Sequence, residues 1–136
     1  MSDGELICVG LDLALWPDVK GQIARAFRYN ADRMSIDDIE ECLHDKTMQL
    51  WGIHDGTLRC VIVTEIVRYP LANAVRVVTV TGENHPQWLA LGAETLSAWG
   101  QENGCTLMEM TGRRGWEKPL MQLGWQQPQI MMTKQI

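Results

Sequence analysis

Apolar residues spaced about four apart predict two amphipathic helices in the first third of the chain. A strand over Glu5–Val9 comes first, and Pro17 is typical of the first turn of the helix that follows. This helix runs through Tyr29, and its apolar stripe consists of Val19, Ile23 and Phe27. Ser35 and Asp38 have the spacing of a capping box, which predicts the start of a second helix with an apolar face made of Ile36, Ile39 and Leu43.

From Met48 onward the apolar pattern becomes that of strands. Met48–His54 and Thr57–Val67 flank Asp55-Gly56, a dipeptide typical of tight hairpin turns, so these two segments are predicted to form a β-hairpin. Residues 60–63 are continuously apolar, which indicates a central strand covered on both faces.

A strand, a helix and another strand follow over residues 75–111. Val75–Thr81 and Cys105–Thr111 are predicted strands, and Pro86 opens the helix between them, which runs to about residue 101. Such a unit is expected to be a right-handed crossover between parallel strands. Trp88 and Trp99 are three helical turns apart, which places them on one face and predicts core packing.

The last predicted elements are a short helix over Trp116–Leu123, which ends at Gly124, and a strand over Gln129–Lys134. The predicted element order is therefore β-α-α-β-β-β-α-β-α-β. Hairpin strands followed by alternating helices and strands predict an α/β (α+β) architecture with one mixed, mostly antiparallel sheet and helices on both faces. The 136 residues match the usual size of one domain, and no repeat or linker divides them, so residues 1–136 are predicted to form a single domain.

Composition narrows the range of partners and cofactors. The chain has 12 basic and 17 acidic residues and a net charge of −5, with no basic run beyond one Arg pair, which argues against nucleic-acid binding. No apolar run approaches the length of a membrane span, and the acidic N-terminus is unlike a signal peptide. The four cysteines form no CxxC pair and the three histidines have no ligand spacing, so no metal is expected and a reducing cytoplasm is the predicted location.

Five sequence blocks carry a resemblance to a known superfamily: MQLWGIHDG (48–56), VIVTEIVRYP (61–70), VRVVTVTGEN (75–84), WLALGAETLSAWGQENGC (88–105) and TGRRGWEKPLMQLGW (111–125). With the element order, they resemble the GNAT (Gcn5-related N-acetyltransferase) superfamily, and more closely the small GNAT-like proteins of tailed bacteriophages and prophages. The resemblance implies a GNAT-like fold and acetyl-CoA as the cofactor of active members. It also implies a location in the host cytoplasm or the virion.

In active members of the superfamily, the loop after the fourth strand holds the pyrophosphate of acetyl-CoA at a helix N-terminus. Carried over to this chain, the backbone from Val78 to Val80 would hold the pantetheine, and the phosphates would contact Gly82, Glu83, Asn84 and His85. The family loop reads Gln/Arg-x-x-Gly-x-Gly/Ala, whereas this junction has one glycine, no leading Arg or Gln, and an added carboxylate. Pro86 also removes a backbone N–H. These departures predict weaker binding of the pyrophosphate.

The resemblance also implies positions for the acid and the base. The family's proton donor is a Tyr on the short helix before the last strand, and the matching position here is Leu120, which cannot donate a proton. Glu65 and Glu109 are the candidate general bases, because each lies in a strand that lines the expected cleft. The structural alternative is that both are solvated or form ion pairs, with Arg68 or Arg76 as partners.

Arg113, Arg114 and Trp116 form a conspicuous group that suits recognition of an anion or a partner protein, because Arg offers a fork of donors and Trp a broad contact surface. The alternative is an ordinary turn with Trp116 tucked against the sheet. Two functions therefore remain. One is a catalytically degenerate component that needs no cofactor and contacts phage structural proteins in the virion or its assembly. The other is an active acetyl-CoA-dependent N-acyltransferase with a divergent loop.

Overall fold

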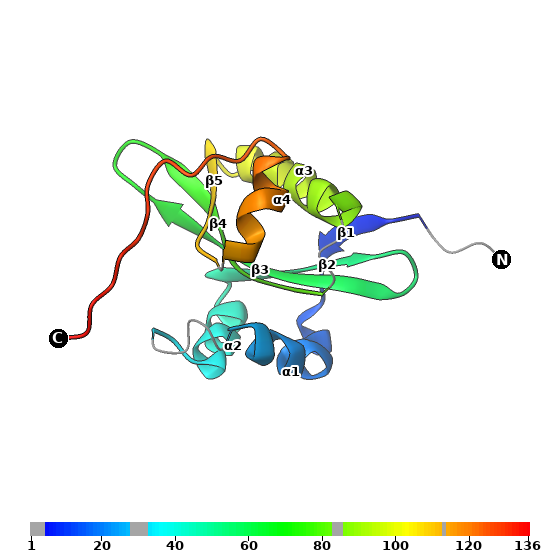
Figure 1. Cartoon of the computed structure of the whole chain (residues 1–136). Helices are drawn as coiled ribbons and strands as arrows, with labels where there is room; N and C mark the ends of the chain where they lie inside the picture. The colour runs from blue at the N-terminus through cyan, green and yellow to red at the C-terminus, as the bar shows by residue number, and fades with distance from the viewer. Residues whose placement is uncertain (1–4, 28–32, 83–85, 113) are drawn as a thin grey trace.

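The computed structural model describes residues 5–27, 33–82, 86–112 and 114–136 (Figure 1). Within these residues, five strands form one sheet in the order β1-β2-β3-β4-β5. The strands are β1 (Ile7–Gly10), β2 (Met48–His54), β3 (Leu58–Arg68), β4 (Asn73–Gly82) and β5 (Leu107–Met110). The helices are α1 (Trp16–Phe27), α2 (Ile36–His44), α3 (Pro86–Glu102) and α4 (Glu117–Met121), and short 3-10 turns, η1 (Leu13–Leu15) and η3 (Arg114–Trp116), precede α1 and α4.

The strand pairing confirms the predicted sheet. Neighbouring strands from β1 to β4 are antiparallel, and β4 pairs with β5 in parallel across the connection through α3. The turn between β2 and β3 places Gly56 at φ 103°, a left-handed conformation that glycine adopts without strain. The mixed, mostly antiparallel architecture is therefore confirmed.

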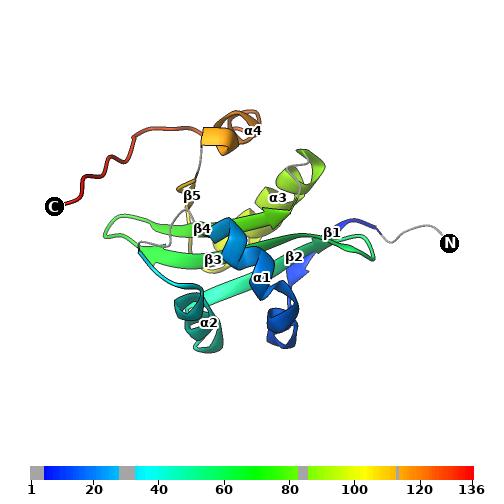
Figure 2. The same cartoon turned by 60° about the horizontal axis from the view of Figure 1, so that its bottom comes forward.

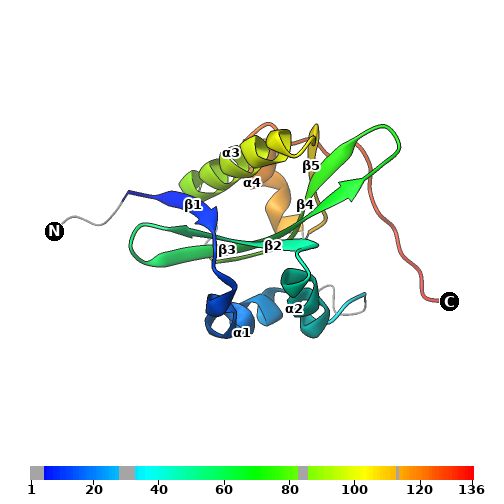
Figure 3. The same cartoon turned by 180° about the vertical axis from the view of Figure 1, so that it is seen from behind.

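Helices cover both faces of the sheet, as predicted: α1 and α2 lie on one face, and α3 and α4 lie on the other (Figures 1 and 3). Two apolar clusters fill the layers between helices and sheet. The cluster under α1 and α2 comprises Trp16, Val19, Ile23, Phe27, Ile39, Leu43, Met48, Leu50, Val61 and Val63. The cluster under α3 comprises Cys8, Trp51, Ile53, Cys60, Ile62, Val77 and Leu96, with Trp88 and Trp99 packed against it. The predicted core role of these two tryptophans is confirmed.

The capping box at the start of α2 is present. The hydroxyl of Ser35 accepts a hydrogen bond from the backbone N–H of Asp38 at 3.2 Å, and the Asp38 carboxylate accepts one from the backbone N–H of Ser35 at 2.8 Å. The bond from the Ser35 backbone, and after it a bond that the Ser35 hydroxyl donates to the same carboxylate at 3.0 Å, lower the pKa of Asp38. Two of the four unpaired N–H groups at this helix start are thereby satisfied.

The predicted strand over Gln129–Lys134 is wrong: residues 125–136 form neither helix nor strand. A strand needs a partner to satisfy its backbone hydrogen bonds, and among the described residues β5 pairs only with β4. The short helix is also shorter than predicted, because its first turn is the 3-10 turn η3 and α4 ends at Met121. Part of the predicted first helix, residues 28 and 29, lies outside the described residues.

None of the described helices has the length and apolar character needed to cross a membrane.

Candidate functional site

Strand β4 carries a bulge that separates its second half from β5. Val63 and Thr64 are adjacent on β3, yet they pair with Thr79 and Val77 on β4, so Val78 is an extra residue without a partner on β3. The parallel pairing with β5 ends at Val77. A bulge bends its strand and increases the local twist. The two parallel strands therefore part at Val78, and a cleft opens between them on the side of α3 and α4.

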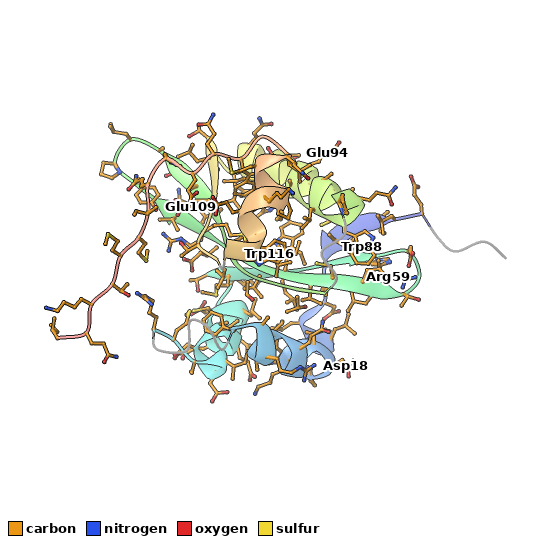
Figure 4. The ribbon with its side chains drawn as sticks, in the orientation of Figure 1. Asp18, Arg59, Trp88, Glu94, Glu109 and Trp116 are labelled. Carbon is orange, nitrogen blue, oxygen red and sulfur yellow. The ribbon has the colours of Figure 1, made fainter. Side chains whose placement is uncertain are left out.

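The cleft contains an apolar cavity of about 40 Å³. Residues from the four strands β2 to β5 line it together with α3, which supplies Trp88 (Figure 4). Trp116 and Leu120 line it from the chain around α4. The full lining is Ile53, Cys60, Ile62, Val77, Val80, Trp88, Leu89, Gly92, Ala93, Leu96, Met108, Met110, Trp116, Leu120 and Trp125. A water molecule needs two to four polar partners, and these side chains offer few, so the cavity suits apolar groups better than water.

A second hollow of about 150 Å³ adjoins this cavity, between α4 and the chain that follows it. The two share Met110, Trp116, Leu120 and Trp125. The outer hollow adds polar groups, among them Glu117, Gln126 and Gln127. The combined site is thus apolar next to β4 and more polar around Glu117, Gln126 and Gln127.

A polar cluster spans β3, β4 and β5, with Arg76 at its centre. The Arg76 guanidinium donates to Glu65 at 3.1 Å and to Glu109 at 3.0 Å. The Tyr69 hydroxyl donates to Glu109 at 2.8 Å and accepts from Arg76 at 3.1 Å. Arg76 stands directly opposite both glutamates in the strand register, which makes them cross-strand neighbours. The pKa of Arg76 is raised: partial burial acts against the charge, but the bonds to Tyr69 and the carboxylates outweigh it.

This cluster lies on the opposite face of β4 from the apolar cavity. Val77 lines the cavity under α3, and successive strand residues point to opposite faces, so Arg76 points toward the α1 and α2 side. Glu65 and Glu109 are brought together by the fold, as a pair that shares one guanidinium. The structural alternative for both is thus realised, with Arg76 and not Arg68 as the shared partner. Tyr69, whose role the sequence did not indicate, comes to Glu109 from a position 40 residues away.

The other predicted site residues are distributed around the cleft mouth. Val78 is the bulged residue, Val80 lines the cavity, and Gly82 ends β4 with φ 114°. A Cβ at Gly82 would lie 2.4 Å from the carbonyl oxygen of Arg59, so only glycine fits there. Glu83, Asn84 and His85 lie outside the described residues, and so does Arg113.

Leu120 and Trp116 are both half-buried, and both line the cavity. A Cβ at Gly112 would approach a ring carbon of Trp116 to 3.2 Å, which shows how closely this side chain packs on the turn before it. The geometry therefore corresponds to the tucked alternative for Trp116. Arg114 begins the 3-10 turn η3. Trp125, which the sequence did not single out, adds a third tryptophan to the lining.

The cysteines near the cleft have suppressed reactivity. Burial raises the pKa of the Cys60 thiol to about 12. Burial also raises the pKa of the Cys8 thiol, partly offset by a hydrogen bond with Thr95. Thiolates are the nucleophilic form of cysteine, so burial disfavours both side chains as nucleophiles at neutral pH. Among the described residues, no group of three or more His, Cys, Asp or Glu is placed to hold a metal ion.

Comparison with known proteins identifies the fold. No protein-family model and no curated protein matches the chain. Solved structures do: a GCN5-related N-acetyltransferase from Ralstonia eutropha has a TM-score of 0.74 at 16% identity, with 97% of this chain and 99% of that chain covered. Glucosamine-6-phosphate N-acetyltransferase from Arabidopsis thaliana has a TM-score of 0.64 at 15% identity, with 96% and 98% covered. A predicted acetyltransferase with acetyl-CoA from Clostridium acetobutylicum has a TM-score of 0.67 at 9% identity, with 96% of this chain and 96% of that chain covered.

These likenesses extend over almost the whole chain, and they establish the GNAT fold for this protein. The fold expected from the five sequence blocks is confirmed. At such identities the likeness carries the fold alone, so function has to be argued from the site.

Proposed function

We propose that this chain is a catalytically degenerate member of the GNAT superfamily that acts through protein–protein contacts and not through acyl transfer. The observation that carries this proposal is Leu120. It occupies the position at which the superfamily resemblance calls for a proton donor, and its side chain lies in a cavity lined by apolar residues. A departing thiolate needs a proton, and the leucine side chain has no acidic proton to donate.

The state of the two candidate bases supports the same conclusion. Glu65 and Glu109 are both bound to Arg76, and Glu109 also accepts two contacts from the Tyr69 hydroxyl, at 2.8 and 3.0 Å. A general base needs a free lone pair within reach of the proton it removes. In this cluster both carboxylates bind the same guanidinium, which favours their charged form and is the arrangement of a structural cross-strand network.

The cavity chemistry adds a third argument. The pantetheine arm of acetyl-CoA carries two amide groups, and burying an amide without a partner costs about 2–7 kcal/mol. The side chains around the 40 Å³ cavity are apolar, and Trp116 and Leu120 occupy its outer wall. Binding an amide-bearing arm there would need partners from the backbone of β4.

An active acetyl-CoA-dependent N-acyltransferase is the second candidate, and one observation favours it. The pairing of β4 with β5 ends at Val77, so among the described residues the later backbone groups of β4 have no partner on β5, on the edge that faces the cleft. Backbone N–H and C=O groups of this kind are strong hydrogen-bonding groups that seek partners. In that case acetyl-CoA would be the cofactor, and Glu65 or Glu109 would have to leave Arg76 to act as the base.

Calorimetry with acetyl-CoA separates the two candidates. Degeneracy predicts no heat of binding at millimolar ligand and no release of thiol with a panel of amines. A Kd tighter than about 100 μM, which is roughly −5.5 kcal/mol, refutes the degenerate assignment. Leu120→Tyr and Leu120→Phe form a matched pair, since they differ only in the hydroxyl. Thiol release by Leu120→Tyr and not by Leu120→Phe would show that the site is otherwise complete and lacks only the proton donor.

For the partner we propose a protein of a phage particle or of its assembly, encountered in the host cytoplasm. The support is the resemblance of the five sequence blocks to phage GNAT-like proteins and the turn with Arg113, Arg114 and Trp116. Gly115 in this turn is exposed, and a Cβ there would contact nothing within 4 Å. A Gly115→Lys variant therefore blocks the surface without disturbing the cavity, unlike a change at Trp116. Gly10 is equally open and exposed, so Gly10→Lys is the matched control.

The measurement is co-purification with phage particles at fixed stoichiometry. Loss of association in Gly115→Lys but not in Gly10→Lys supports the proposed partner surface. Equal association of both variants refutes it.

A further inference from the structure

The hollow between α4 and the chain that follows it combines two indole rings with a carboxylate. Trp116 and Trp125 both line it and are half-buried, while Glu117 lines it from the start of α4 and is exposed. The hollow measures about 150 Å³, whereas one water molecule needs about 10–15 Å³, so it has room for a group of several heavy atoms. Figure 2 shows α4 and this chain on the far side of the molecule from α2. The hollow therefore lies on the opposite face of the sheet from the Arg76 cluster.

Among the described residues, the two indole rings of the hollow have no other aromatic or polar partner. Trp51 and Trp99 pack edge to face with each other, but neither Trp116 nor Trp125 contacts another described aromatic ring. No described group accepts a hydrogen bond from either indole nitrogen. The face of an indole ring carries partial negative charge and attracts a cation placed over it. Two such rings beside one hollow form part of a cage for a positively charged group.

Both rings are positioned by the protein itself. A Cβ at Gly112 would lie 3.2 Å from a ring carbon of Trp116 and 3.1 Å from the terminal methyl of Met110, so this wall is closely packed. The backbone N–H of Trp125 donates to the Leu120 carbonyl at 3.1 Å, which holds the chain beside α4. A site whose walls are already in place loses less conformational entropy when a ligand binds.

The lining favours an organic cation over a metal ion. Among the described residues that line the hollow, Glu117 is the only ionisable one, and Gln126 and Gln127 add amide groups. The rest of the lining is apolar: Met110, Gly112, Trp116, Leu120, Met121 and Trp125. A metal ion needs several ligating side chains, which one carboxylate does not provide.

Among organic cations, a quaternary ammonium group suits this lining best. A primary ammonium is strongly hydrated and has three N–H donors, each of which needs an acceptor once water is removed. A quaternary ammonium has no N–H, so its methyl groups can contact Leu120, Met121 and the indole rings without leaving a donor unsatisfied. Its charge would be attracted by the rings and by Glu117, and the net charge of −5 on the chain adds attraction at long range.

We propose that the hollow lined by Trp116, Trp125 and Glu117 binds a quaternary ammonium group, carried by a small molecule such as choline or by a trimethylated lysine side chain. This binding is not acyl transfer, because a quaternary nitrogen has no lone pair to accept an acyl group. It rests neither on acetyl-CoA nor on a phage partner. Selectivity comes from the attraction between the cation and the indole rings, so a neutral ligand of the same shape binds more weakly.

Titration of the full wild-type chain with choline, followed by NMR through the indole N–H signals, tests the proposal. Ionic strength is held constant with sodium chloride. We expect the signals of Trp116 and Trp125 to shift with a Kd of about 1 mM or below, and 3,3-dimethylbutan-1-ol, the neutral carbon isostere of choline, to bind about tenfold more weakly. No saturable shift with choline, or equal affinity for the two ligands, overturns the proposal. This comparison needs only the wild-type chain, so it does not depend on the folding of any variant.

Two pairs of variants locate the site. Trp125→Leu removes one ring of the cage and should weaken choline binding about tenfold. Trp88→Leu is its matched control, because Trp88 is also half-buried but lines only the apolar cavity. Glu117→Gln should weaken choline binding about two- to fivefold and leave the affinity for the neutral alcohol unchanged. Glu41→Gln removes the same charge from α2 on the opposite face and should change neither affinity.

Loss of choline binding in Trp88→Leu but not in Trp125→Leu overturns the proposal, because the ligand must then occupy the apolar cavity. A peptide with one trimethyllysine, compared with the same peptide unmethylated, distinguishes the two sources of the group. Binding of the trimethylated peptide about tenfold or more tighter than choline assigns the site to a protein side chain, since neighbouring peptide residues then add contacts. Binding no tighter than choline assigns it to a small molecule, and both results support the quaternary ammonium site. Tighter binding of the unmethylated peptide overturns it.

Discussion

Two buried threonines in the sheet provide a matched test of how hydrogen bonding contributes to the stability of this fold. Thr64 is fully buried, accepts a hydrogen bond from the indole N–H of Trp51 at 2.9 Å, and donates one to the Gln49 side chain at 2.9 Å. Thr81 is 6% exposed, and among the described residues its hydroxyl has no partner. The same Thr→Val change thus removes two hydrogen bonds at one site and none at the other.

Opposite effects on the free energy of unfolding are expected. Thr64→Val leaves the buried indole N–H of Trp51 without an acceptor, which costs about 1–3 kcal/mol. Thr81→Val removes an unsatisfied hydroxyl and adds a buried methyl group, which should stabilise the protein by about 1 kcal/mol. The shape change is nearly identical, so packing differences largely cancel in the comparison.

Equilibrium unfolding in urea measures both effects, provided that the slope of the free energy with denaturant stays constant across the three proteins. With a slope of about 1–3 kcal/mol per molar, the two variants should have midpoints separated by roughly 1–2 M. Destabilisation by Thr81→Val of the same size as that by Thr64→Val would refute the reasoning, because it would mean that the Thr81 hydroxyl is hydrogen-bonded in the folded protein.

Other predictions follow from the packing and charges. Gly100→Ala should destabilise the fold by about 1–3 kcal/mol, since its Cβ would lie 2.6 Å from a buried Val75 methyl. Gly92→Ala should be neutral or stabilising in the same unfolding assay, because its Cβ would come no closer than 3.4 Å to any neighbour. Burial raises the pKa of the Cys60 thiol from 9.0 to about 12, so the protonated thiol contributes its full stabilising effect below pH 9. This contribution is lost as the pH rises toward 12, and the wild type should therefore lose more stability between pH 9 and 12 than Cys60→Ala. Arg76→Met should cost about 1 kcal/mol or less in thermal unfolding, because the charges it leaves unpaired are partly solvated; a loss several times larger would contradict this estimate.

The candidate bases can be predicted from the sequence, but the arginine that binds them cannot. The sequence identified Glu65, Glu109 and two possible arginine partners. The choice of Arg76 depends on strand register, since Arg76 stands opposite both carboxylates in the pairing of three strands. Register arises from contacts between segments more than ten residues apart, and local patterns do not contain it.

The element types were determined by the sequence itself. Apolar spacing of four placed α1, continuous apolar runs placed β3 and β4, and Asp55-Gly56 placed the hairpin turn, because these signals reflect local backbone preferences. Only the tertiary structure decided the bulge at Val78, the burial of Trp116 and Leu120 in one cavity, and the absence of a strand at 129–134. Each of these depends on a partner distant in the chain: a bulge exists only relative to the opposite strand, a cavity needs walls from several elements, and a strand needs an edge to pair with.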